Sequence, residues 1–197
     1  MVGGVPPRKK LKTPIRIDHR KALMYYVEGF FVVIQSSDKG YNVQLKKLGP
    51  SFYTDNTHLI QSLDFINGAW QAGKIRGYGI VVVSINNLTF GIPLRSNIKH
   101  DACYVTVRSN IAGIKGKGLD FSKAVLLKKP SHISPSPFRI PSDEFSKLKG
   151  KAAFITNKFE KYVERYVKAV GLNDGNILNS DEFRFSTLIN YHSELGI

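Results

Sequence analysis

The stretch GKIRGYGIVVVSINNLTFGIPLRSN, residues 73–97, decides the fold. It contains two apolar runs, Ile80–Ile85 and Leu88–Leu94, and both are typical of strands. Asn86 and Asn87 lie between the runs and suit a two-residue turn, so the stretch predicts an antiparallel β-hairpin. Because a tight turn brings the chain back beside itself, we expect the two outer ends of the hairpin to lie together.

Cations, hydroxyl groups and an imidazole gather at these two outer ends. A guanidinium group binds two phosphate oxygens at once, and lysine, tyrosine or histidine side chains can transfer protons. The sequence therefore predicts a phosphodiester-binding site at the two outer ends of the hairpin, which we call the mouth. Its residues are Lys74, Arg76 and Tyr78 before the first strand, and Arg95, Ser96, Asn97, Lys99 and His100 after the second.

Candidate roles follow from the chemistry of RNA, whose own 2′-hydroxyl can attack the phosphorus. The protein then supplies a base, an acid and donors for the charge that develops. Ser96 lacks the glycine-flanked turn of a hydrolase nucleophile, and its cationic neighbours favour an anionic ligand. Two structural alternatives stay open: Tyr78 packs at a strand start, and His100 is an exposed loop histidine. The candidate catalytic residues are Ser96, Lys74, Arg76 and Tyr78, and the candidate RNA-binding residues of this mouth are Arg95, Asn97, Lys99 and His100.

The charge balance indicates a polyanionic partner. The 197 residues include 29 Lys and Arg against 15 Asp and Glu, a formal charge of +14. Nucleic acid is the commonest partner of such proteins, and a basic protein without a specific partner is the alternative. Cys103 is the only cysteine, which excludes an intrachain disulfide and fits a reducing cytoplasm. The histidines are scattered without ligand spacing, so we expect neither a metal nor a cofactor.

The first 41 residues differ from the rest and predict an N-terminal extension. They begin with glycines, prolines and a basic run, a composition typical of flexible tails, and we expect one strand around Phe30–Ile34. The apolar run Tyr25–Ile34 is interrupted by Glu28, is too short to span a bilayer and precedes no cleavage site. We therefore expect a protein that is neither exported nor membrane-bound.

Residues 42–197 predict one α+β domain with a strongly curved antiparallel sheet or small barrel and several helices. A helix capped by Thr156 or Asn157 carries an apolar stripe up to Gly171, and this aromatic-rich stripe is typical of core packing. The other predicted elements are a strand near Val43–Leu48, a short helix or irregular segment at His58–Phe65, a strand at Cys103–Arg108, a flexible basic loop at Gly113–Gly118, a buried strand late in Leu119–Lys128, a loop at Pro130–Pro141 and a last helix at Asp181–Glu194, with Phe183, Leu188, Ile189 and Tyr191 facing inward.

Further basic residues extend the predicted RNA surface. Lys115 and Lys117 alternate with glycines, which would let the backbone approach phosphates closely, and Lys123 follows them. Lys161 and Arg165 lie on the polar face of the predicted helix. We expect these five residues to bind RNA, and a solvated surface is the alternative for each.

Several segments together resemble one family of bacterial toxins. They are FYTDNTHLIQSLDFINGAW, GKIRGYGIVVVSINNLTFGIPLRSNIKH, GIKGKGLDFSKAV, KFEKYVERYVKAV and TLINYHSELGI, all within residues 42–197. The chain resembles the TenpN branch of type III toxin–antitoxin toxins, which is related to ToxN and AbiQ. The family serine that follows Pro-Leu falls on Ser96, and the family lysine falls at Lys74 or Arg76. Arg95 and Asn97 stand where the family often has threonine and proline.

The resemblance implies a MazF/Kid-like curved barrel and a metal-independent endoribonuclease. Such toxins cut RNA by 2′-hydroxyl attack and leave a 2′,3′-cyclic phosphate. Their partners are a small, structured, pseudoknotted antitoxin RNA cut from a repeat precursor, in an RNA–protein hetero-oligomer, and cellular or phage mRNA as substrate. The resemblance also implies a cytoplasmic role in phage defence by abortive infection.

A non-catalytic RNA- or DNA-binding regulator that uses the same basic surface is the alternative. The sequence shows no helix-turn-helix, no RRM-type aromatic motif and no zinc knuckle, which are the common signatures of that class. The resemblance favours the endoribonuclease.

Overall fold

The computed structural model describes residues 22–27, 30–35, 43, 45–62, 65–66, 69–70 and 79–197. The chain forms two compact units, residues 1–41 and 42–197. In the first unit, β1 (Ala22–Val27) and β2 (Phe30–Gln35) form an antiparallel hairpin. The strand predicted near Phe30 is confirmed, whereas β1 was not predicted.

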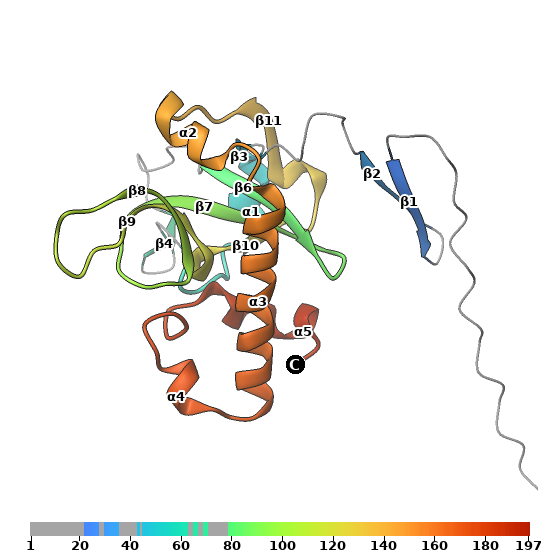
Figure 1. Ribbon diagram of the computed structural model, residues 1–197. Helices are drawn as coiled ribbons and strands as arrows, with labels where there is room; N and C mark the ends of the chain where they lie inside the picture. Colours follow the sequence, from blue (N-terminus) through green and yellow to red (C-terminus); the bar gives the residue numbers. More distant parts are fainter. Residues whose placement is uncertain are drawn as a thin grey trace, which may run out of the picture. The chain divides into compact units, whose positions relative to one another are not determined.

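The second unit is α+β, as predicted, and is built on one seven-stranded antiparallel sheet (Figure 1). Within the described part of the chain, the strand order is β11–β3–β6–β7–β9–β8, and β10 pairs with β7. The strands of this sheet are β3 (Leu45–Leu48), β6 (Gly79–Ile85), β7 (Leu88–Ile98), β8 (Cys103–Arg108), β9 (Gly116–Asp120), β10 (Val125–Leu126) and β11 (Ile133–Pro137). A separate ribbon pairs β4 (Phe65–Ile66) with β5 (Ala69–Trp70).

The predicted barrel is wrong, because the sheet is neither closed nor strongly curled. Closure would require the border strands β11 and β8 to pair with each other. Instead the chain leaves β11 and forms helix α2 (Ser142–Leu148), which packs against β8. Each border strand therefore has one strand partner among the described residues.

The predicted hairpin is confirmed. β6 and β7 pair from Ile85↔Leu88 to Ile80↔Pro93. Asn86 and Asn87 have φ angles of 48° and 62°, the left-handed values that a tight hairpin turn requires. However, β7 continues to Ile98, so Arg95, Ser96 and Asn97 lie within a strand and not after it. The strand continues because β9 pairs with its second half.

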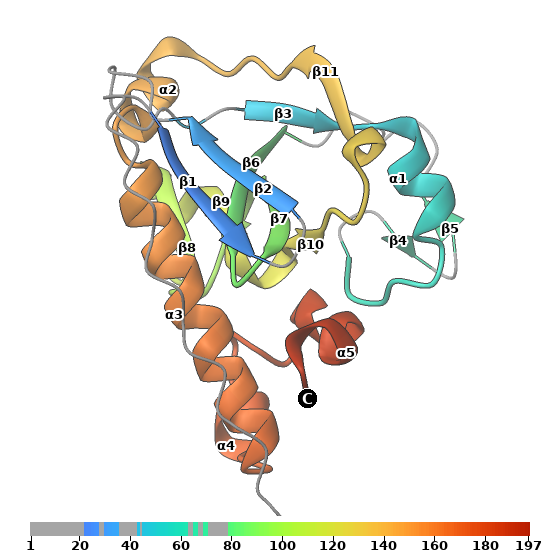
Figure 2. The same ribbon diagram turned by 90° about the vertical axis from the view of Figure 1, so that its right-hand side faces the viewer.

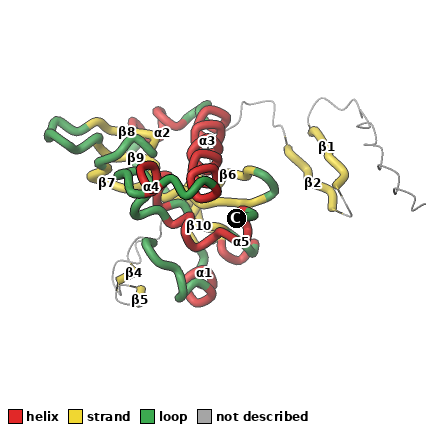
Figure 3. The backbone as a smooth tube through the Cα atoms, turned by 90° about the horizontal axis from the view of Figure 1, so that it is seen from below, coloured by secondary structure: helices red, strands yellow, loops and turns green. Residues whose placement is uncertain are grey.

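The predicted loop at Gly113–Gly118 is wrong in its second half, where β9 begins. A Cβ atom on Gly116 or Gly118 would lie 2.0 Å from a carbonyl oxygen of β8. The glycines thus allow β8 and β9 to approach closely, so they mark a close contact and not a flexible loop. Figure 3 shows the two strands side by side, with the loop between them at their far end. The strand predicted at Cys103–Arg108 coincides with β8.

The buried strand predicted late in Leu119–Lys128 is confirmed as β10, whereas the loop predicted at Pro130–Pro141 is wrong in part. A 3₁₀ turn, η1 (Phe121–Lys123), separates β9 from the short strand β10. The predicted loop at Pro130–Pro141 contains a second turn, η2 (Pro130–His132), and then β11. Prolines are tolerated in β11 because it is a border strand, whose outward N–H groups have no ladder partner to lose.

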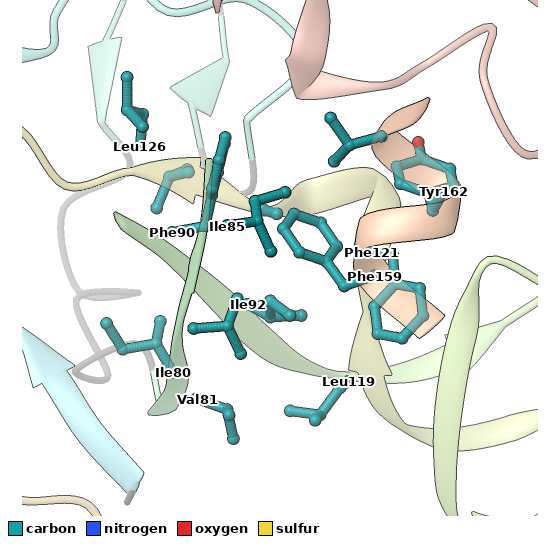
Figure 4. Close-up of a cluster of buried hydrophobic side chains, with 14 of the residues drawn as sticks. Ile80, Val81, Ile85, Phe90, Ile92, Leu119, Phe121, Leu126, Phe159 and Tyr162 are labelled. Atoms are coloured by element: carbon teal, nitrogen blue, oxygen red, sulfur yellow. The ribbon is translucent and has the colours of Figure 1, made fainter. Parts of the chain in front are cut away.

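Helix α3 (Ala152–Gly171) covers one face of the sheet (Figure 2) and confirms the predicted long helix, although it starts before Thr156. The ring centroids of Phe159 and Phe90 of β7 lie 5.3 Å apart, and Phe121 lies 5.6 Å from Phe159. Figure 4 shows these rings packed with aliphatic side chains of β6 and β7. The aromatic stripe of α3 is therefore core, as predicted. The buried residues of this cluster include Ile80, Val81, Ile85, Ile92, Leu119, Leu126 and Tyr162.

The single last helix predicted at Asp181–Glu194 is wrong. Turns lead into η3 (Thr187–Tyr191) and the short helix α5 (His192–Leu195). Thr187 donates its hydroxyl proton to the core backbone at Ser122 and Ala124, which fixes the segment in a non-α conformation. Phe183, Leu188 and Tyr191 are buried as predicted, but Ile189 is 47% exposed.

Among the described residues, three helices were not predicted: α1 (Pro50–Asp55), α2 and α4 (Gly175–Leu178). The described part of the segment after α1, up to Ser62, is irregular, which was one of the two alternatives for residues 58–65. Among the described helices, none combines the length and the apolar character that a bilayer crossing requires.

Candidate functional site

A β-bulge places two polar side chains on the surface of β7. Arg95 pairs with Gly118 and Ile98 with Gly116, so Ser96 and Asn97 together lie opposite the single residue Lys117. Asn97 has a φ angle of 57°, which a non-glycine residue adopts at some energetic cost. Both side chains of the bulge are exposed. Bulges re-aim side chains and are frequent beside active sites, and this one leaves Ser96 open to solvent.

Arg95 lies at the start of the bulge and reaches across to β9. Since Arg95 is opposite Gly118, Asp120 is its diagonal neighbour on the same face of the sheet. The Nη1 atom of Arg95 lies 2.9 Å from Oδ2 of Asp120, and the Asp120 side chain is fully buried. The Arg95 side chain is itself 37% exposed. A guanidinium has five N–H donors, so Arg95 is anchored on one side and keeps donors for an anion on the other.

Three residues place hydrogen-bond donors around the carboxylate of Asp120. Its Oδ1 atom accepts hydrogen bonds from the backbone N–H of Ser122 at 3.0 Å and from the Ser122 hydroxyl at 2.7 Å. Nε2 of His100 lies 3.4 Å from the same oxygen. Burial raises the pKa of Asp120, but the hydrogen bonds from His100, Arg95 and Ser122 outweigh it and hold the pKa below its usual value. The carboxylate is therefore charged at neutral pH.

The hydrogen bonds around His100 fix its tautomer. Ser122 gives its only hydroxyl proton to Asp120, so its oxygen can only accept from His100 Nε2, 3.2 Å away. Nε2 therefore carries a proton, and in the neutral ring Nδ1 keeps a free lone pair. Nδ1 is buried without a hydrogen-bond partner among the described residues, and the side chain is 9% exposed. His100 is thus a carboxylate-held imidazole and not the exposed loop histidine of the alternative interpretation.

Lys123 directly follows Ser122 and connects this part of the protein to distant parts of the chain. Its Nζ atom donates to the carbonyl oxygens of Gln61, at 2.8 Å, and Phe185, at 2.7 Å. Burial lowers the pKa of Lys123 to about 8, while the charge of Asp120 opposes this shift and that of Arg95 adds to it. Lys123 is buried, so its ammonium group ties three segments together beneath the surface.

The remaining sequence-predicted residues lie outside the Asp120 cluster, by which we mean Arg95, His100, Asp120 and Ser122. Lys115 pairs with Asp101 at 2.9 Å, and Lys117 with Glu144 at 2.7 Å. Lys99 is exposed in the turn after β7. Lys161 is exposed on α3, and Arg165 pairs with Glu182 at 2.7 Å. Lys74, Arg76 and Tyr78 lie outside the described residues.

Sequence reasoning missed Asp120 and Ser122. An aspartate that accepts the N–H of the residue two positions later is a common local turn, and the Asp-Phe-Ser sequence permits it. The contact of Asp120 with Arg95 depends instead on the register between β7 and β9, which no local pattern reveals. No group of three or more His, Cys, Asp or Glu side chains within the described ranges could hold a metal ion.

A cavity of about 320 Å³ lies elsewhere, between the β6–β7 turn, α3 and α5. Asn86, Val163, Val167 and Leu195 contribute to its lining, and none of the sequence-predicted site residues that the structure describes does.

Comparison with known proteins found no matching family model, no matching curated protein and no matching solved structure. The resemblance to type III toxins therefore stays a prediction, and the function must be argued from the site. The Asp120 cluster combines an anchored, part-exposed guanidinium with a carboxylate-held imidazole, and the exposed Ser96 follows Arg95 in the chain. This arrangement can bind an anion and move a proton close to it.

Proposed function

We propose that this protein is a metal-independent endoribonuclease, the toxin of a type III toxin–antitoxin system. One observation carries the proposal: Arg95 and His100 share the buried carboxylate of Asp120, and Arg95 directly precedes the exposed Ser96 of the bulge in β7. The formal charge of +14 supports a polyanionic substrate. The sequence resemblance supports RNA and the toxin role.

In the proposed reaction, the ribose 2′-oxygen attacks the adjacent phosphorus. Its proton is accepted by Nδ1 of His100, an atom that is buried in the free protein and has to become exposed when RNA binds, and Asp120 stabilises the positive charge that results. The bond between phosphorus and the 5′-oxygen breaks, and the leaving oxygen takes a proton from water. The products are a 2′,3′-cyclic phosphate and a 5′-hydroxyl group. The free N–H groups of Arg95 and the hydroxyl of Ser96 donate to the phosphoryl oxygens as their negative charge grows.

Two further parts of the proposal rest on the sequence alone. Lys74, Arg76 and Tyr78 complete the site, and a small, structured antitoxin RNA neutralises the toxin by binding the same basic surface. In this proposal the toxin acts in the cytoplasm on cellular or phage mRNA, as part of phage defence.

The decisive experiment is cleavage of a defined RNA by the purified full chain in the presence of EDTA, with analysis of the product ends. We expect cyclic phosphate ends, a loss of at least about 100-fold in rate for Arg95→Ala, and a loss of about 10²–10⁴-fold for His100→Gln, the usual range for an acid–base group. Lys168→Ala, on the far part of α3, serves as the control and keeps full activity. If the folded, chelator-treated protein binds RNA and leaves every transcript intact, the alternative of a non-catalytic regulator is favoured.

A further inference from the structure

The turn between α2 and α3 carries cations that no acid neutralises. Lys147, Lys149 and Lys151 are all exposed within five residues of chain, and none has an ion-pair partner among the described residues. Several cations elsewhere are paired with an acid. These paired cations are Arg95, Lys115, Lys117, Lys128, Lys129, Arg165 and Arg184. Other exposed cations without such a partner among the described residues, including Lys99, Arg108, Arg139, Lys161 and Lys168, are spread over several elements, whereas this turn gathers three within five residues.

Two exposed aromatic rings flank the three lysines. Phe145 of α2 is 39% exposed and Phe154, in the first turn of α3, is 59% exposed. The rings of Phe154 and Tyr104 meet edge to face, with centroids 6.0 Å apart and an interplanar angle of 66°. Tyr104 in turn donates its hydroxyl proton to the carbonyl oxygen of Lys147 at 2.7 Å. Tyr104 of β8 thus braces both helices and holds Phe154 while most of that ring faces solvent.

The backbone of the turn is also fixed. The N–H of Lys149 donates to Phe145, and the N–H of Lys151 donates to Leu148, both at 3.0 Å. Leu148 is fully buried, and Gly150 adopts a φ angle of 69°, which glycine adopts without strain. The cations and rings are therefore held on a preformed surface, and little backbone ordering is needed before a ligand binds.

We propose that this α2–α3 platform, made of Phe145, Lys147, Lys149, Lys151 and Phe154, binds single-stranded RNA. Unpaired bases stack on an exposed aromatic ring, and lysines bind the phosphates between them. Double-stranded RNA offers no free base face to Phe154, and an acidic peptide has no bases that could stack on the exposed rings. The proposal rests on the proposed function, because it assigns how the RNA is held during cleavage.

The platform adjoins the Asp120 cluster. Phe154 and Lys158 are one helical turn apart on α3, and Nζ of Lys158 donates to the carbonyl oxygen of Cys103 at 2.7 Å. Cys103 is the direct strand partner of Asp120. An RNA strand stacked on Phe154 therefore lies within one helical turn of the β8–β9 edge that holds the cluster, and the platform supplies binding outside the reacting bond.

The test measures binding of a fluorescent single-stranded oligonucleotide with 2′-O-methyl groups, which cannot undergo 2′-hydroxyl attack. We expect the full chain carrying Lys147→Ala, Lys149→Ala and Lys151→Ala to bind at least 10-fold more weakly. The slope of log K against log salt should fall by about 2 units, since each phosphate contact on a single strand contributes about 0.7. Phe154→Ala should weaken binding about 5- to 150-fold without changing that slope.

A charge-matched control carries Lys46→Ala, Lys47→Ala and Lys168→Ala, which removes three cations that are not part of the platform. This control should bind within about 3-fold of the natural chain, well inside the effect that three phosphate contacts produce. Unfolding in urea verifies that all variants are folded. For cleavage of a natural RNA, we expect the platform variants to raise KM and leave kcat unchanged.

The outcomes separate this inference from the proposed function. If the natural chain cleaves RNA while the platform variants bind like the control, the platform is overturned and the endoribonuclease stands. If the natural chain neither binds nor cleaves RNA, both fail. Tighter binding of a duplex or of an acidic peptide than of the single strand also overturns the platform.

Discussion

Asp120 is the residue on which the candidate site depends. Its carboxylate is fully buried, and it holds Arg95, His100 and Ser122 in one geometry. A buried carboxylate is tolerated only where several donors compensate the loss of water, and two of the donors here, Arg95 and His100, are the groups that would contact RNA in the proposed reaction. The stability of the fold and the alignment of the site are therefore linked through a single side chain.

This linkage gives a prediction for Asp120→Asn. The change keeps the shape but removes the charge, so we expect a loss of about 1.5–3 kcal/mol in the free energy of unfolding at pH 7. Because the pKa of Asp120 is lower in the folded than in the unfolded state, its contribution is complete above the unfolded value of about 4 and declines as the pH falls below it. The difference between natural chain and variant should thus shrink toward pH 3, as measured by urea unfolding.

Asp101→Asn is the matched control, since its carboxylate pairs with Lys115 at the exposed surface. An exposed pair contributes at most about 1 kcal/mol, so this variant should remain close to the natural chain. Equal losses for the two variants would contradict the role assigned to Asp120.

At the level of elements, the hairpin could be predicted and β9 could not. The hairpin is encoded locally, by two apolar runs and an Asn-Asn turn whose φ angles are both positive. By contrast, the alternation of glycine and lysine at Gly116–Gly118 is typical of a loop, and only the closeness of β8 explains why these glycines belong to a strand. At the candidate site, too, local sequence patterns reveal only part of the arrangement. Ser96, Arg95 and His100 are neighbours in sequence and were predicted together, whereas Asp120 joins them through a long-range register.

The closeness of β8 and β9 gives the prediction for this level. In Gly118→Ala, the new Cβ atom would lie 2.0 Å from the carbonyl oxygen of Tyr104 and 2.8 Å from Cα of Val105. Both neighbours are backbone atoms, so β8 must shift, and we expect a loss of about 1–3 kcal/mol in the free energy of unfolding. Urea unfolding followed by circular dichroism measures it.

Gly171→Ala provides the comparison, because nothing lies within 4 Å of the added atom and alanine favours the helix. That variant should be neutral or slightly more stable. A Gly118→Ala protein as stable as the Gly171→Ala protein would show that the strands are not as close as described.

For the whole molecule, the dominant property is its excess of 14 positive charges. Cations that bind phosphates release the counterions condensed on the nucleic acid, so affinity falls with added salt. Among the described residues, ion pairs neutralise some of the cations within the protein, and the other cations stay available to bind phosphates. The available cations determine how steeply the affinity for RNA depends on salt.

We therefore expect the affinity of the full chain for a non-cleavable RNA to fall at least 10-fold between about 50 and 200 mM salt. Fluorescence anisotropy at constant pH measures this dependence. A DNA strand of the same length and sequence is the control for the ribose contacts and should show a similar slope. An affinity that does not change with salt would contradict electrostatic recognition of the backbone.

The open sheet has a consequence for self-association of the protein. Uncovered border strands invite foreign chains to extend a sheet, which leads to aggregation. Here one border strand, β11, carries Pro135 and Pro137, which have no N–H group to offer, and the other, β8, is interrupted by a bulge at Thr106. Both borders thus discourage the addition of another copy, and the fold stays open at its edges without becoming a template for fibrils.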